Sequence, residues 1–124
     1  MPVDYDTHEL AWAAGFWDGE GYTGCTPRKK NGQPQVCLKI SQSGDPSLLY
    51  RFQNAVGGIG TVNGPYDKGT SKVTGLPFKP VYTWSVDSLV GRQQVMACMW
   101  PWLGTVKQDQ FISATLRARS WFKG

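Results

Sequence analysis

Two carboxylates that lie close together, Asp18 and Glu20, are the residues of this 124-residue chain best suited to chemistry. They follow an uncharged stretch from Leu10 to Trp17, and Gly19 separates them. Carboxylate oxygens bind hard cations such as Mg²⁺, and a bound cation can activate water for hydrolysis. If a helix ends here, its dipole and the charge of Asp18 both disfavour a second negative charge on Glu20. A cation is therefore the natural partner of Glu20.

The uncharged stretch predicts a short helix that must position these acids. At about 100° per residue, large apolar residues cover most of the helix circumference, and this distribution predicts burial on all sides. Small residues occupy one strip, where a second backbone could approach closely. This strip consists of Ala11, Ala14, Gly15 and Asp18. Gly19 and Gly21 end the helix and leave Glu20 at a buried C-terminal end. The alternative is an ordinary core helix that ends in two acids.

The segment 13–21, AAGFWDGEG, resembles the signature motif of the LAGLIDADG homing endonucleases. Four positions match that motif, namely Ala14, Gly15, Asp18 and Gly21. Conservative variants stand at Phe16, Gly19 and Glu20, whereas Ala13 and Trp17 depart from the usual aliphatic residues. The rest of the chain resembles the same family to nearly its last residue.

Periodicity and turn residues predict the elements around this motif. Asp6 and Glu9 form a capping box for the first helix. Strands 22–26 and 35–42 flank a basic turn that contains Asn31-Gly32, a strong hairpin signal. Asp45, as a cap before Pro46, opens a helix that ends near residue 56. Strands 60–66 and 81–86 follow, and a long polar connection over 67–80 joins them. A connection of this length in a compact domain is usually functional or mobile.

The C-terminal part is predicted to be helical. Ser88 caps one helix, which Pro101 ends, and Thr105 opens the last helix. The last helix is expected to pack through Phe111, Ile112, Thr115, Leu116 and Trp121. In the strands 35–42 and 81–86, alternate side chains point to opposite faces of the sheet. The inward-facing residues are Val36, Leu38, Ile40, Tyr82, Trp84 and Val86. The outward-facing residues are Gln35, Cys37, Lys39, Ser41, Val81, Thr83 and Ser85. The prediction is one α+β domain over residues 1–124, of order αββαββα(α). It has a four-stranded antiparallel sheet, helices on one face and an open concave face.

Composition limits the classes of partner. The net charge of +4 permits a polyanionic partner without proving one. Three cysteines without metal-type spacing are expected to be reduced thiols. The single histidine, His8, is expected on the surface, which argues against nucleases built on several histidines. There is no apolar run of about 20 residues and no signal-peptide pattern, so no membrane partner is expected. The expected location is cytoplasmic, in a bacterial or phage-encoded protein, or organellar, and not secreted.

The resemblance implies a homodimer, because family members with one motif copy pair through their motif helices. It places the metal ligands at Glu20 and the Gly19 carbonyl, for Mg²⁺ or Mn²⁺. Gln42 would position water, and Lys107 would be the basic residue of the site. A further basic residue that the family often has is missing, because this region reads Ser43-Gly44-Asp45-Pro46. Lys107 could also be an ordinary surface lysine in a first helical turn.

The resemblance also implies that the open sheet face binds double-stranded DNA. Direct reading of bases needs donors and acceptors, such as Arg or Lys for guanine and Gln or Asn for adenine. By strand phase, the candidates are Tyr22, Thr26, Arg28, Lys30, Gln35, Lys39, Ser41, Asn63 and Thr83.

Three functions remain open on the sequence. The first is a homodimeric homing endonuclease that hydrolyses both strands of a long pseudo-palindromic site in intron homing. The second is an inactive module of the same fold that binds DNA as a regulator or binds intron RNA as a maturase. A basic scaffold that binds protein is the third, and it leaves the Arg and Lys residues of the sheet unexplained.

Overall fold

The computed structural model of the protein describes residues 5–27 and 34–122. Helix α1 (Thr7–Glu20) leads into strands β1 (Gly21–Pro27) and β2 (Pro34–Ser43), and helix α2 (Ser47–Ala55) follows. Strands β3 (Thr61–Tyr66) and β4 (Val81–Val86) come next. Helix α3 (Leu89–Met99), the short 3-10 helix η1 (Trp100–Trp102) and helix α4 (Thr105–Phe122) complete the chain. The predicted order of helices and strands is confirmed.

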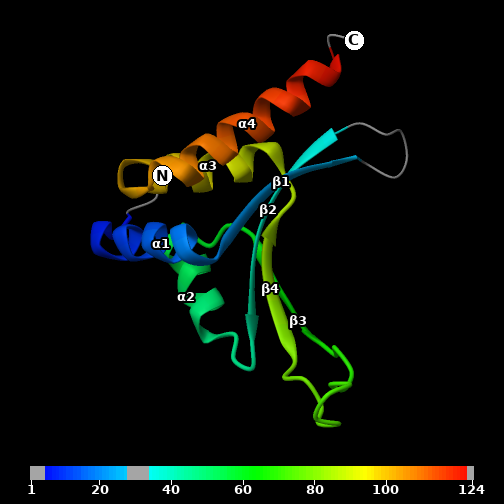
Figure 1. The fold of residues 1–124 in the computed structure, drawn as a ribbon. Helices are drawn as coiled ribbons and strands as arrows, with labels where there is room; N and C mark the ends of the chain where they lie inside the picture. Colours follow the sequence, from blue (N-terminus) through cyan, green and yellow to red (C-terminus); the bar gives the residue numbers. More distant parts are fainter. Residues whose placement is uncertain (1–4, 28–33, 123–124) are drawn as a thin grey trace.

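The four strands form one antiparallel sheet of order β1-β2-β4-β3. The helices lie on one side of this sheet and leave its other face open (Figure 1). The alternation predicted for β2 and β4 is confirmed, because Val36, Leu38, Ile40, Trp84 and Val86 are buried. This α+β arrangement buries one sheet face and presents the other to solvent.

Aromatic side chains hold α1 and α2 against the sheet. The rings of Phe52 and Trp84 lie 4.8 Å apart, and Trp17 meets Trp84 edge-on at 6.2 Å between centroids. All three side chains are fully buried. Trp17 is one turn before Glu20, so this cluster fixes the end of α1 that carries the acids.

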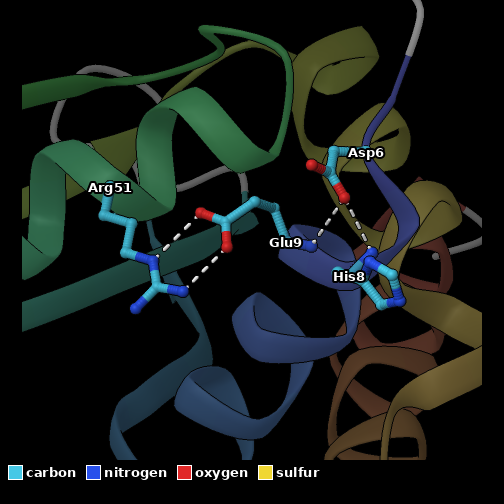
Figure 2. Close-up of polar contacts among 4 residues, drawn as sticks. All are labelled: Asp6, His8, Glu9 and Arg51. Atoms are coloured by element: carbon cyan, nitrogen blue, oxygen red, sulfur yellow. Dashed lines mark hydrogen bonds and ion pairs between the residues drawn. The ribbon is translucent and has the colours of Figure 1, made fainter.

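Two helix starts differ in detail from the prediction. The Asp6 carboxylate caps α1 by accepting from the backbone N–H groups of His8 and Glu9, at 2.9 and 3.3 Å (Figure 2). The reciprocal half of the capping box is absent, because the Glu9 side chain pairs with Arg51 of α2. At α2 the cap position is Pro46, and Asp45 instead accepts from the N–H of Ser47 at 2.9 Å.

Two predictions about helix burial are wrong. Helix α1 is not buried on all sides, because Gly15, Asp18, Gly19 and Glu20 are exposed. On α4, Ile112 and Leu116 are 45% and 57% exposed, whereas Ala114 is the buried residue. Phe111 and Thr115 are half-buried, and the side chain of Trp121 lies outside the described residues. In Figure 1 the C-terminal part of α4 extends past the other helices.

The connection 67–80 is an ordered extension of the β3–β4 hairpin. A β-bridge joins Thr70 to Pro77, and the N–H of Phe78 donates to the Gly69 carbonyl at 2.9 Å. The three cysteines are free, as expected, and His8 is exposed. None of the described helices is both long enough and apolar enough to span a bilayer.

Candidate active site and nucleic-acid interface

Glu20 lies at the junction where α1 ends and β1 begins. The N–H of Gly21 donates to the Trp17 carbonyl, and Gly21 itself adopts an extended conformation that starts the strand. A side chain at Gly21 would collide with the Trp17 ring, so a glycine is needed for this close approach. The expectation that Glu20 is buried is wrong, because Trp17 fills the core and the chain then turns outward. The Glu20 carboxylate is exposed and makes no hydrogen bond or ion pair with any described residue.

Lys107 reaches the same junction from the first turn of α4. Its Nζ donates to the Gly21 carbonyl oxygen at 2.7 Å, across a separation of 86 residues. The side chain is half-buried. Its ammonium group is held one residue from Glu20 along the chain.

Gln42 lies at the end of β2, beside this junction. Gly21 pairs with Ile40, so β2 continues past the start of β1, and Gln42 pairs with Tyr82 of β4. The Gln42 Nε2 donates to the Ser41 carbonyl at 3.1 Å and to neither Glu20 nor Lys107. The structure therefore places the Lys107 ammonium group on the carbonyl that follows Glu20 in the chain, without an ion pair between the two side chains. Gln42 lies two residues past Ile40, the strand partner of Gly21.

Asp18 has a partner that the sequence does not indicate. Both of its carboxylate oxygens accept from the N–H of Gly104, each at 3.1 Å. Gly15 is exposed, with no atom within 4 Å of an added Cβ, and Ala11 is half-buried. Ala14 is fully buried within the chain and belongs to its own core, so it is not part of an accessible strip. The open strip on α1 consists of Ala11, Gly15, Asp18 and Gly19.

A row of polar side chains crosses the open sheet face. Tyr22 pairs with Lys39, whose Nζ lies 5.2 Å from the centre of the Tyr22 ring. The hydroxyl groups of Ser41 and Thr83 are 3.0 Å apart, and Asn63 lies beside Thr83 in the register. These residues come from four different strands and share one face, as the predicted alternation requires.

Other predicted contact residues are placed only in part. Gln35 lies on the same face, and its Nε2 donates to the Asp87 carbonyl at 3.3 Å. Thr26 pairs with Gln35 in the register, but its side chain is not described. Arg28 and Lys30 lie outside the described residues. Thr61 and Ser85 pair with each other, and Ser85 also pairs with Lys39, so both join the row. The alternation of β4 gives Ser85 this orientation, but neither residue was among the predicted contacts.

The oxygen atoms at the junction suit a divalent cation, but they are too few to bind one without further oxygen ligands. Glu20 offers an uncommitted carboxylate, and Gly19 is exposed beside it. Within residues 5–27 and 34–122, no three His, Cys, Asp or Glu side chains gather into a metal site. Hard cations take six or more oxygen ligands and accept water and phosphate among them. The residues present thus fit a cation whose other ligands come from outside one chain.

Comparisons with known proteins give matches among solved structures. No family model matches the chain, and no curated protein is significantly similar to it. The homing endonuclease I-CvuI, solved with a DNA target, is 24% identical with a TM-score of 0.64, and the match covers 92% of this chain and 68% of that one.

Two further homing endonucleases match over nearly the whole chain. I-TnaI is 22% identical with a TM-score of 0.64, and the match covers 100% of this chain and 77% of that one. The group I intron-encoded I-CeuI, complexed with DNA, is 10% identical with a TM-score of 0.66, over 99% of this chain and 59% of that one. At these identities the similarity is one of fold. The chain has the fold of the LAGLIDADG homing endonucleases, and its segment 13–21 resembles their motif.

Proposed function

We propose that this protein is a homodimeric endonuclease that requires a divalent metal and cuts both strands of a long, roughly palindromic DNA site. The observation that carries the proposal is the α1–β1 junction. There an exposed Glu20 carboxylate without a described partner lies one residue from a carbonyl that holds the Lys107 ammonium group. A role in intron homing is part of the proposal, supported by the similarity to an intron-encoded endonuclease.

The open sheet face supports DNA as the substrate. Its row of Tyr22, Lys39, Ser41 and Thr83 supplies hydrogen-bond donors and acceptors of the kind that read base edges in the major groove. The row begins next to the junction, because Tyr22 directly follows Gly21, the first residue of β1. A duplex that lies along the sheet would therefore bring a phosphate close to Glu20. I-CvuI, which shares the fold, was solved with DNA in the presence of Mg.

The metal would be Mg²⁺ or Mn²⁺, held by the Glu20 carboxylate and the Gly19 carbonyl, with DNA, water and a second Glu20 as further ligands. When bound, such an ion activates water and stabilises charge on the oxygens around phosphorus. Lys107 would add a positive charge that is held at the neighbouring Gly21 carbonyl. Gln42 can turn its amide toward a water molecule once DNA is bound. Two copies of the chain would supply one such site for each strand.

A second candidate is an inactive nucleic-acid-binding module that acts as a maturase or regulator. One observation favours it. The family's further basic residue is missing from 43–46, and Asp45 in that region is engaged at the start of α2. An inactive module has no use for an uncommitted acid that faces a phosphate, so Glu20 separates the two candidates.

The test compares two glutamate-to-glutamine changes on the same helix. Wild-type protein is incubated with a randomised duplex library and Mg²⁺, and the new DNA ends are sequenced to find the site. Glu20→Gln removes the charge that binds the metal, so cleavage should fall by orders of magnitude while binding in Ca²⁺ persists. Glu9→Gln, a matched change at the opposite end of α1, should cleave normally. Equal losses of binding and cleavage in Glu20→Gln would show that Glu20 is structural.

A further inference from the structure

The first turn of α4 is tied to the end of α1 at two points, one on each side of Glu20. On one side, the Asp18 carboxylate accepts from the N–H of Gly104 through both oxygens at 3.1 Å. On the other side, the Gly21 carbonyl accepts from Lys107 Nζ at 2.7 Å. The N–H of Gln108 donates to the Gly104 carbonyl at 3.1 Å, so Gly104 and Lys107 belong to the same helical turn.

The contact between Asp18 and Gly104 is built for a carboxylate. The N-terminus of α4 carries a partial positive charge and unpaired N–H groups, which a negative side chain stabilises. A Cβ on Gly104 would lie 3.3 Å from each Asp18 oxygen, tighter than an ordinary contact, so glycine keeps room for the carboxylate. Both oxygens of Asp18 accept from a backbone N–H of its own chain.

We propose that Asp18 is a positioning residue that holds the first turn of α4 so that the Lys107 ammonium group stays on the Gly21 carbonyl, one residue along the chain from Glu20. This inference rests on the proposed function. It assigns the first acid of the motif to the placement of the basic group, and the second acid to the metal. Lysine has a long flexible side chain, so the backbone from which it extends must be fixed if its charge is to be fixed. Misplacement of a catalytic group by about 1 Å can lower a rate by about 100-fold.

The cleavage test uses Asp18→Ala and Asp18→Asn, each made in the wild-type and Lys107→Ala backgrounds. With enzyme in excess over DNA, Asp18→Ala should lower the cleavage rate by about 10-fold to 100-fold. Asp18→Asn keeps one oxygen that can accept from Gly104, so it should recover most of the rate. In the Lys107→Ala background, Asp18→Ala should add almost nothing, because residues that act as one unit are not additive. DNA affinity in Ca²⁺ should stay within about threefold of the wild-type value.

Asp6→Ala is the matched control. Asp6, at the opposite end of α1, also accepts a hydrogen bond from a backbone N–H at the start of a helix, as Asp18 does from Gly104. It should not alter the cleavage rate in either background. If Asp18→Ala slows cleavage by the same factor with and without Lys107, Asp18 acts on folding or assembly and the inference is overturned.

A spectroscopic readout separates this inference from the proposed function. In NMR spectra of the protein without DNA, Asp18→Ala should shift the side-chain ε-carbon signal of Lys107 and speed hydrogen exchange of the Gly104 amide. Asp18→Asn should change the Lys107 signal and the Gly104 exchange rate less, and Asp6→Ala should change neither. If the wild type cuts no DNA, the proposed function fails while these signals still test the contact. Unchanged Lys107 and Gly104 signals in Asp18→Ala overturn the inference whatever the cleavage result.

Discussion

Lys39 shows what one side chain on the open sheet face can contribute. It extends from the centre of β2, opposite Tyr22 on one side and Ser85 on the other. Its ammonium group lies 5.2 Å from the Tyr22 ring, close enough for a cation–π contact that restricts where the charge points. A lysine held in this way suits recognition of a base edge or a single phosphate. A freely moving lysine would only add to the general attraction of DNA.

Lys39→Ala should weaken DNA binding by about 1–3 kcal/mol and relax the choice of base at one position if the side chain reads a base. If Lys39 contacts only a phosphate, affinity should fall similarly for all sequences and the salt slope should decrease by about 1. Binding of the selected site and of a scrambled duplex at several salt concentrations distinguishes these cases. Arg119→Ala, which removes an exposed charge near the end of α4, is the control. Unchanged affinity at low salt in Lys39→Ala would exclude this face as the DNA surface.

Residue placement could be predicted where it depends on local pattern. The alternation of β2 and β4 gave the correct side for Lys39, Ser41 and Thr83, because a strand repeats every two residues. The contacts that build the site could not be predicted in this way. Lys107 with Gly21, and Asp18 with Gly104, each join residues 86 positions apart. Such pairs depend on how α4 docks against α1, which no local pattern encodes.

Among the elements, α1 and α2 are joined by an exposed cluster that the sequence pattern did not indicate. Arg51 of α2 donates to both oxygens of Glu9, at 3.0 and 2.7 Å (Figure 2). Its guanidinium group lies 3.9 Å from the centre of the Trp12 ring. The hydrogen bond from Arg51 lowers the pKa of Glu9 below its ordinary value, against a smaller opposing effect of burial. One arginine thus connects an acid and an aromatic side chain of α1 to α2.

This pair predicts how stability depends on acid pH. The pKa of Glu9 is lower in the folded protein than in the unfolded chain. Its contribution is therefore present above the ordinary value of 4.5 and is lost as pH falls through the folded value. Wild-type protein should be more stable than Glu9→Gln near neutral pH, and the difference should shrink toward zero in acid. Urea unfolding of both proteins across this range measures it. A difference that does not change with pH would show that the charge of Glu9 is not responsible.

Prediction of the elements succeeded for the strands and failed for the faces of two helices. Strand positions follow from alternation and from turn residues, which are local. The exposed faces of α1 and α4 depend instead on how many layers cover each helix. Ile112 and Leu116, four residues apart, were expected to pack against the core, yet both are exposed on α4. Periodicity shows that a helix has an apolar side. It does not show whether other elements of the fold cover that side.

At the scale of the whole molecule, one chain holds only part of the proposed machinery. The described residues of a single copy contain no complete metal site, and one motif supplies one uncommitted acid. The exposed strip of α1, which includes Gly15 and Gly19, lies on the same helix as that acid. A second copy packed against this strip would bring two Glu20 residues close together, so the proposed cutting of both strands requires assembly.

Gly15→Leu tests this assembly without disturbing the single chain. An added Cβ at Gly15 meets no atom within 4 Å, so the monomer accommodates the leucine, and replacing a helical glycine should raise helix stability by up to about 1 kcal/mol. If another α1 packs there, the leucine must separate the two backbones, which costs about 1–3 kcal/mol. Light scattering at matched concentration should therefore show a wild-type dimer and a folded Gly15→Leu monomer that no longer cuts both strands. Gln93→Leu, an equally exposed change on α3, should remain dimeric. A wild-type protein that stays monomeric even on its DNA site would rule out the homodimer.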